Sequence, residues 1–220
     1  MSDKTSIEMF DISRPLNDEL AEWPGDAPFH FESTKQIAQG DVVNLGKIDM
    51  SVHNGTHADG WFHFDSDAET VDRVPLENFF GPATVVDLAR KFSSGTEREI
   101  AIVDLEATSA QLQRAPRLLI KTGIWRDSTV FPDWIPVISQ DVPDWLKERG
   151  VKLIGVDVPS VDAIDAKVLR NHHALYAGRI AIVESLDLSE IKAGVYNFAA
   201  LPLKITGGDG APVRAILWRG

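Results

Sequence analysis

Cysteine is absent from the 220 residues of this chain, and so is any long hydrophobic run. Without cysteine there can be no disulfide, no thiolate nucleophile and no sulfur ligand for a metal. A metal site in this chain would therefore have to use histidine, aspartate and glutamate. No run of about 18 apolar residues occurs, so we expect no membrane-spanning helix and no membrane partner.

Positive charge is also scarce, with 22 Lys and Arg against 33 Asp and Glu and a net charge of −11. Because such a surface repels phosphate backbones, we expect no nucleic-acid partner. The N-terminal sequence MSDKTSIEMFDIS lacks the apolar core of a signal peptide. These features predict a cytoplasmic protein, which the lack of cysteine fits.

The remaining composition is that of a folded protein, with 44% hydrophobic and 25% charged residues. No internal repeat, low-complexity tract or linker interrupts the chain. We therefore expect one domain over residues 1–220, long enough to bury a sizeable core.

Short apolar runs bounded by Gly, Pro or charged residues predict most of the strands. These runs are residues 83–88, 117–122, 152–158, 179–183, 195–205 and 213–218. Apolar and polar side chains alternate over residues 48–52, which predicts a half-buried strand.

Helices are predicted from fewer segments, namely residues 105–113, 142–149 and 165–176. Asp104 is the expected N-cap of the first helix. Pro143 in the first turn and Gly150 after the last turn mark the ends of the second helix.

The order of these elements predicts an α/β or α+β domain with a mixed sheet, because strands outnumber helices and do not alternate strictly with them. The sequence GGDG at residues 207–210 predicts a turn. It lacks the strand and helix on either side that a dinucleotide-binding loop requires.

The segment SVHNGTHADGWFHFD, residues 51–65, carries most of the candidate chemistry. It contains His53, His57 and His63, with Asp59 between them. In an extended chain these four odd-numbered positions would share one face. Imidazole and carboxylate are suitable ligands for zinc, manganese or iron, so the cluster predicts a metal site. Each histidine by itself would equally fit a surface loop or a core position.

A second cluster lies in NHHALYAGRIAIVE, residues 171–184. His172 and His173 end a predicted helix, and Glu184 follows an apolar strand. A buried carboxylate needs a partner for its charge, and a metal would supply one. The alternative is that Glu184 begins a turn and His172 is exposed.

Together these segments resemble the cyclase family, and most closely its bacterial kynurenine formamidase (arylformamidase) branch. The family motif H-x-G-T-H-x-D-x-P-x-H is similar to HNGTHADGWFH at residues 53–63. Similar segments follow one another along nearly the whole chain, namely DISRPLN, WPGD, VNLGKIDMS, LIGVDVPSVD, HHAL, ALPL and DGAPVRA.

The resemblance implies a compact β/α domain with a small barrel-like mixed sheet and flanking helices. It also implies a homodimer with its sites near the subunit interface. The implied reaction is the metal-dependent hydrolysis of N-formyl-L-kynurenine to L-kynurenine and formate, in tryptophan degradation by the kynurenine pathway. Hydroxide formed at the metal would attack the formyl carbon of this aryl formamide.

The resemblance also assigns roles to residues, with two divalent metal ions per subunit. Zinc is the usual metal of this branch, and manganese is the alternative. The implied ligands are His53, His57 and Asp59 for the first metal, Asp59 and Glu184 as bridges, and His172 for the second. His173 is the alternative to His172.

Two further roles are implied by the resemblance. His63 would act as the catalytic acid and base, because it lies beside the ligands without being counted among them. Trp23 would line the substrate pocket.

One departure from the family motif is Trp61, which stands after Gly60 where the family has proline. It would place a large ring beside the site, and both Trp23 and Trp61 could stack on the substrate ring. The departure leaves open a related hydrolase acting on another aryl or cyclic amide, such as isatin. A metal-binding protein without catalysis is a third alternative. Candidate partners for a substrate carboxylate are Arg126, Arg179 and Lys204.

Overall fold

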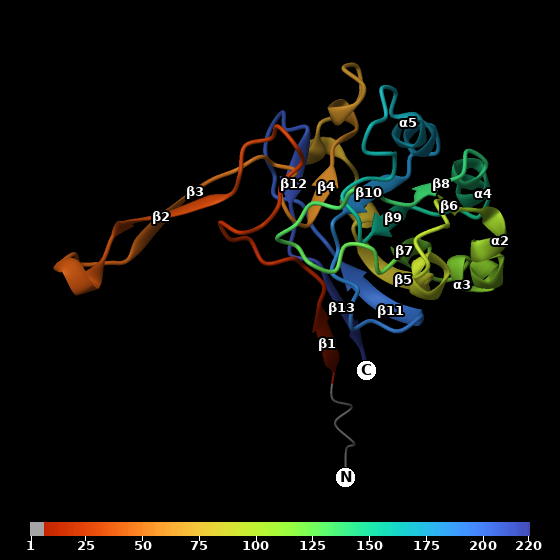
Figure 1. Ribbon diagram of the computed structural model, residues 1–220, viewed down its shortest axis with the longest axis horizontal. Coiled ribbons are helices and arrows are strands. Elements are labelled where there is room, and N and C mark those ends of the chain that lie inside the picture. Colours follow the sequence, from red (N-terminus) through yellow and green to blue (C-terminus); the bar gives the residue numbers. More distant parts are fainter. Residues whose placement is uncertain (1–6) are drawn as a thin grey trace, which may run out of the picture.

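The computed structural model describes residues 7–220, and its centre is a curled sheet of nine strands (Figure 1). In spatial order the strands are β1 (Glu8–Asp11), β13 (Ile216–Arg219), β11 (Gly194–Ala199), β5 (Phe80–Asp87), β7 (Arg117–Lys121), β9 (Leu153–Val156), β10 (Ala181–Glu184), β4 (His57–Asp59) and β12 (Gly210–Pro212).

The sheet is mixed, as the sequence predicts. Strands β5, β7, β9 and β10 run parallel, and the pairs outside this group are antiparallel. The parallel strands are covered on both faces, which explains their continuous apolar sequences. Along β7, Leu118 and Ile120 belong to one hydrophobic cluster and Leu119 belongs to the other. The central strands are thus fixed by packing on both sides.

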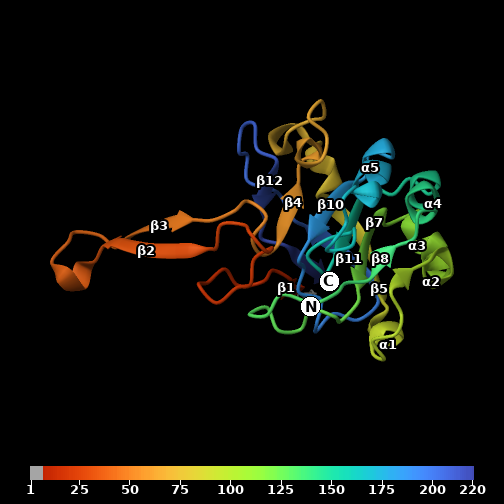
Figure 2. The same cartoon turned by 45° about the horizontal axis from the view of Figure 1, so that its top comes forward.

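The helices are short, and in both views α2 to α5 lie to one side of the sheet (Figures 1 and 2). They are α1 (Ala89–Phe92), α2 (Ile102–Leu105), α3 (Ser109–Leu112), α4 (Val142–Glu148) and α5 (Arg170–Ala177). Single 3₁₀ turns occur at Ile37–Gln39, Trp61–His63, Val71–Arg73, Leu76–Asn78 and Glu106–Thr108. The expected mixed α/β fold with a barrel-like sheet is confirmed, the sheet curling into a half-barrel.

Several element boundaries differ from the predictions. The strand expected over 195–205 ends at Ala199, and beyond it Pro202 forms only an isolated bridge with Val213. The helix expected over 105–113 is broken into short turns and begins at Ile102. Asp104 does cap it, but from inside its first turn, where its carboxylate accepts the amide of Ala101 at 2.8 Å.

The helix expected over 165–176 starts only at Arg170. Its first turn is held by Asp162, a residue of the preceding loop. The carboxylate of Asp162 accepts the amides of Asn171 and His172 at 3.1 and 3.2 Å, and so satisfies two groups that a helix start leaves free.

Strands β2 (His30–Lys35) and β3 (Leu45–Asp49) form a hairpin that projects away from the nine-stranded sheet (Figures 1 and 2). The expectation of a half-buried strand over 48–52 is wrong, because every residue of β3 is exposed and the strand ends at Asp49. The arm carries exposed apolar side chains, including Phe31, Leu45 and Ile48. A second small sheet pairs β6 (Glu99–Ile100) with β8 (Val137–Ile138).

Among residues 7–220, no helix combines the length and hydrophobicity that a membrane span needs. The prediction about a signal peptide concerns MSDKTSIEMFDIS, whose first six residues lie outside the described residues.

Candidate metal centre

Strand β4 carries the centre of the site and lies between β10 and β12. Glu184 of β10 is in register with His57, and Gly210 of β12 is in register with Asp59. Strand alternation turns His57 and Asp59 to the same face, while Ala58 between them enters the core. Three segments far apart in the sequence therefore meet at this point.

His53 and His63 reach the site through turns on either side of β4. Only His57–Asp59 is a strand, so the four odd-numbered positions do not lie on one extended segment. His53 belongs to a turn that continues through Gly55, whose φ of +65° is a left-handed conformation. His63 ends the 3₁₀ turn Trp61–His63. Turns on both sides of β4 thus direct these two rings toward the strand.

Asp59 is the most buried charged group of the site, with 1% of its surface exposed. Its Oδ1 lies 3.2 Å from Nδ1 of His53 and 3.4 Å from Nε2 of His57. Its Oδ2 lies 3.6 Å from Nε2 of His172. Neither oxygen has a hydrogen-bond partner. A buried carboxylate that faces three imidazoles without hydrogen bonds has the surroundings of a metal ligand.

Glu184 lies between two of the same imidazoles. Its Oε2 is 3.5 Å from Nε2 of His57, and its Oε1 is 3.6 Å from Nε2 of His172. Oε1 also accepts the amide of Val161 at 3.0 Å. Asp59 and Glu184 therefore each have one oxygen facing His57 and the other facing His172.

The other ring nitrogen of each buried imidazole contacts an acceptor outside the cluster. Nδ1 of His57 lies 2.9 Å from the carbonyl of Gly55, and Nδ1 of His172 lies 2.7 Å from Asp162. Such contacts fix the ring orientation and leave one nitrogen free to bind a metal.

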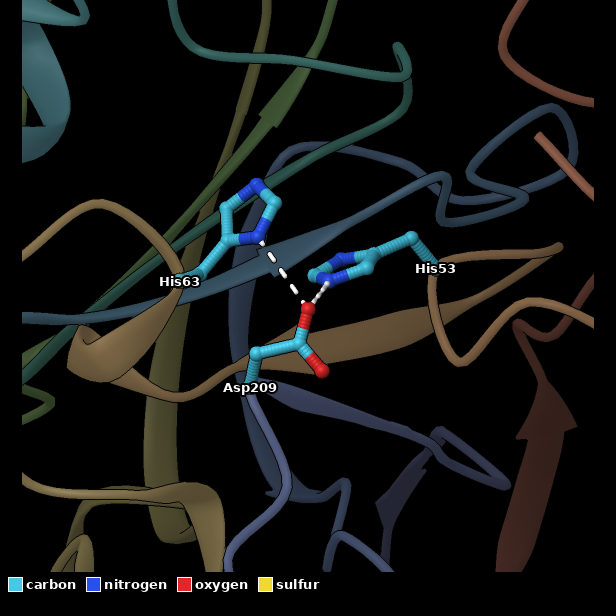
Figure 3. A group of neighbouring side chains, drawn as sticks. All are labelled: His53, His63 and Asp209. Carbon is cyan, nitrogen blue, oxygen red and sulfur yellow. Dashed lines mark hydrogen bonds and ion pairs between the residues drawn. The ribbon is translucent and has the colours of Figure 1, made fainter. Parts of the chain in front are cut away.

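His53 follows the same pattern, since its Nε2 lies 3.1 Å from Oδ2 of Asp209. The same Asp209 oxygen is 3.5 Å from Nδ1 of His63 (Figure 3). His63 thus stands outside the group around Asp59, with a third of its side chain exposed.

The charges of the cluster shift its proton affinities strongly. Burial lowers the pKa of His57, but Asp59 and Glu184 outweigh it and raise the pKa to about 10. Burial likewise opposes the effect of Asp209 and Asp59 on His53, whose pKa rises to about 8. Burial raises the pKa of Asp59, yet the surrounding imidazoles hold it well below its usual range. The carboxylates therefore attract positive charge, whether from protons or from a metal.

The donor set fits divalent metals. Three sets of ligand atoms each lie within 4.8 Å of one another, namely His53, His57 and Asp59; Asp59, His172 and Glu184; and His53, His63 and Asp209. The first two sets share Asp59 and contain the five residues that the sequence singles out as ligands. His173 is in none of them and is exposed, so the geometry favours His172 over His173.

Asp162 and Asp209 were not predicted from the sequence. Both lie within segments that resemble the family, LIGVDVPSVD and DGAPVRA, but the resemblance gave neither of them a role. The turn prediction for residues 207–210 is consistent with the structure, where β12 begins at Gly210.

A cavity of about 490 Å³ opens beside the cluster and is lined by His53, His57, His63, His172 and Glu184, among others. Trp23 lines it as expected, and its ring packs edge-on against Phe131 with centroids 5.4 Å apart. Trp125 contributes a third aromatic wall. The cavity can therefore hold an aromatic ring next to the candidate metal ligands.

Trp61 does not line this cavity, and the expectation that it would stack on a substrate is wrong. Its side chain is 1% exposed and packs in the core. The guanidinium of Arg179 lies 4.0 Å above the ring and pairs with Glu69. The ring is thus buried away from the cavity beside His63.

Among the described residues, the cavity is not lined by Arg126, Arg179 or Lys204. Its cationic side chain, apart from the histidines, is Lys167.

Comparison with known proteins agrees with this geometry. The family model "Putative cyclase" matches residues 10–163. A protein of Bacillus cytotoxicus named kynurenine formamidase is 42% identical over 210 residues, which cover 96% of this chain and 97% of that protein. A protein of the same name from Bacillus cereus is 42% identical over 97% of this chain and 98% of its own length.

Solved structures share the fold at lower identity. One described as a "potential metal-dependent hydrolase with cyclase activity" has a TM-score of 0.80 at 23% identity, covering 98% of this chain and all of the other. Isatin hydrolase A from Ralstonia solanacearum has a TM-score of 0.81 at 24% identity, covering 97% of this chain and 92% of the other.

Proposed function

This chain belongs to the cyclase family, and we propose that it is a metal-dependent arylformamidase that hydrolyses N-formyl-L-kynurenine to L-kynurenine and formate. The observation that carries the proposal is the buried, unpartnered carboxylate of Asp59 among three imidazoles, which themselves line an aromatic cavity. In this role the enzyme serves tryptophan degradation by the kynurenine pathway.

Five residues would hold the metal. We propose two ions per subunit, with zinc favoured and manganese as the alternative. His53, His57 and Asp59 would bind the first, His172 and Glu184 the second, with Asp59 and Glu184 shared between the two. A divalent metal bound there supplies Lewis acidity, since it polarises a carbonyl and lowers the pKa of water from 15.7 to about 7.

The aromatic walls would bind and orient the substrate. Trp23, Trp125 and Phe131 can enclose its aryl ring, and the formyl group then points toward the cluster. Lys167 is available for the substrate carboxylate.

His63 would move the proton. It lines the cavity beside the cluster, and in residues 7–220 no carboxylate of the Asp59–Glu184 pair lies within ion-pair distance of it. Hydrolysis forms a bond from a water oxygen to the formyl carbon and breaks the bond from that carbon to the aryl nitrogen. His63 takes the proton of the attacking water and gives it to the departing nitrogen, so that a neutral arylamine leaves.

The alternative of a related hydrolase acting on isatin or another cyclic amide rested on Trp61. Because that ring is buried away from the cavity, the motif departure gives no reason to prefer it. A non-catalytic metal-binding protein would not need a cavity beside the ligands or an exposed imidazole within it.

We also propose that the protein is a cytoplasmic homodimer. The exposed apolar side chains of the β2–β3 arm support the dimer, because an apolar projection is stabilised when a second copy covers it. Light scattering of the purified protein should give twice the mass of 24.2 kDa. A monomer over the accessible concentration range would contradict this part of the proposal.

The decisive experiment is turnover of N-formyl-L-kynurenine before and after chelation, with zinc or manganese added back. We expect activity to disappear with the chelator and to return with one metal. Isatin and formanilide provide the comparison substrates. A fully metallated protein that hydrolyses isatin but not formylkynurenine would overturn the proposal.

A further inference from the structure

The loop at residues 206–209 brings one carboxylate to the edge of the site. Asp209 directly precedes β12, whose Gly210 is in register with Asp59. The backbone fixes this position from both sides, because Gly60 donates to the carbonyl of Asp209 at 2.7 Å and Val71 donates to that of Gly208 at 2.8 Å. The carbonyl of Gly60, in turn, accepts the amide of His63 at 3.0 Å. Asp209 and His63 are therefore tied to one short piece of backbone.

The Asp209 side chain contacts two histidines with different roles. Its Oδ2 lies 3.1 Å from Nε2 of His53 and 3.5 Å from Nδ1 of His63 (Figure 3). His53 turns its other nitrogen toward Asp59. The rings of His53 and His63 lie with centroids 4.1 Å apart. One carboxylate oxygen thus links a candidate metal ligand to the candidate acid and base.

An acceptor at one nitrogen of an imidazole determines which nitrogen carries the hydrogen in the neutral ring. The contact of Asp209 with Nδ1, at 3.5 Å, favours the neutral His63 ring with its hydrogen there, which leaves Nε2 as the nitrogen that can exchange a proton. With Asp209 at Nε2, His53 leaves Nδ1 free on the side of Asp59. The same oxygen therefore sets the orientation of both rings.

We propose that Asp209 is a positioning residue that holds His63 for proton transfer to the departing arylamine while holding His53 for the metal. The part concerning His63 rests on the proposed function. Loss of Asp209 leaves the substrate cavity in place but frees the His63 ring. The step that suffers is the one in which Nε2 of His63 gives its proton to nitrogen as the carbon–nitrogen bond breaks.

The test uses the zinc-loaded full chain with Asp209→Asn and Asp209→Ala. Nitrogen NMR of the protein labelled at its six histidines reports the ring tautomers, and the signal missing from His63→Gln identifies His63. We expect neutral His63 to carry its hydrogen on Nδ1 in the unaltered protein and to lose that preference in both variants. Asp72→Asn is the matched control, because Asp72 supports the same loop through the amide of Gly207 without contacting either histidine.

A pair of substrates gives the second readout. A para-methoxy formanilide needs full protonation of its leaving nitrogen, whereas a para-nitro formanilide needs less. We expect Asp209→Ala to lower kcat/KM by about 100-fold for the first and by no more than about 10-fold for the second. Zinc affinity should fall by about 10- to 100-fold, since Asp209 also orients His53.

Either of two results would overturn the inference: an unchanged His63 tautomer in Asp209→Asn, or equal losses on the two formanilides. If the unaltered enzyme cleaves neither N-formyl-L-kynurenine nor the formanilides, the proposed function fails. The tautomer and zinc measurements still decide whether Asp209 positions the two rings.

Discussion

Nδ1 of His172 lies 2.7 Å from Oδ2 of Asp162, and the same carboxylate caps the helix that carries His172. Asp162 thereby connects the start of α5 to the orientation of a candidate metal ligand. Asp162→Asn should weaken binding of one of the two proposed metals by about 10- to 100-fold, while the fold remains intact. Zinc titration with a competing chelator measures this. If the variant binds both metals as tightly as the unaltered protein does, Asp162 only caps the helix. Asp165→Asn, in the same loop, is the matched control.

The role of His63 in turnover should be separable from metal binding. We expect His63→Ala to keep its full metal content but to lose about 10²- to 10⁴-fold in kcat for N-formyl-L-kynurenine, because it removes the proton carrier and no ligand. Metal analysis beside steady-state kinetics tests both halves. Loss of one equivalent of metal would instead show that His63 is a metal ligand, together with His53 and Asp209.

The metal-free protein should lose stability as the pH rises. The pKa of His53 is raised to about 8 by Asp209 and Asp59, which outweigh burial. A raised pKa means that the folded state binds the proton more tightly than the unfolded state. The resulting stabilisation is complete below the unfolded value of about 6.5 and disappears as the pH rises through about 8. Thermal unfolding of chelated protein between pH 6 and 9 should show this decline.

The control for this pH effect is His53→Gln, which should make the decline shallower. It should not abolish the decline, because His57, whose pKa is raised to about 10, still contributes over this range. Metal binding at pH 7 must also displace the proton of His53. Calorimetry in buffers of different ionisation enthalpy should therefore detect proton release. A metal-binding enthalpy that is independent of the buffer would contradict the prediction.

Gly210 should be required for the position of His53. A methyl group at residue 210 would lie 2.7 Å from Cε1 of His53, so Gly210→Ala must displace the ring or the strand. We expect reduced metal content and reduced turnover. Gly155→Ala is the control, because it creates a similar clash with Leu119 in the core. That variant should lower the melting temperature without changing the metal stoichiometry. Full metal content in Gly210→Ala would show that the ring adjusts freely.

Lys167 should contribute to substrate choice. We expect Lys167→Met to raise KM for N-formyl-L-kynurenine by about two- to fivefold, the range of an exposed charge pair, with formanilide unaffected because it has no carboxylate. Lys204→Met lies outside the cavity and is the control. Equal effects on both substrates would remove Lys167 from the recognition of the carboxylate.

The candidate site was predictable because three candidate ligands and the candidate acid and base lie within eleven residues, His53 to His63. The resemblance supplied the roles of the other ligands. Asp162 and Asp209 were not, since their roles depend on a helix start and on pairing between β12 and β4. Such contacts between distant segments leave no local pattern. The central strands were predictable because β7, β9 and β10 are buried on both faces and read as continuous apolar runs.

Trp61 and the β2–β3 arm show the limits of local patterns. The position of Trp61 beside His63 in the sequence said nothing about which side of the 3₁₀ turn its ring would occupy. The alternation at residues 48–52 is the pattern of a strand with one buried face. Among the described residues, every residue of β3 is exposed and the strand ends at Asp49, so the alternation predicted both the bounds and the burial wrongly.

The order of strands in the sheet also has a consequence for synthesis. Strand β1 pairs only with β13, the last strand of the chain, and β4 lies between β10 and β12. During translation, His53, His57 and Asp59 leave the ribosome long before the strands that enclose them. The nascent chain therefore carries three candidate metal-binding groups without their protecting neighbours. The sheet around them can close only after β10 and β12 have been synthesised.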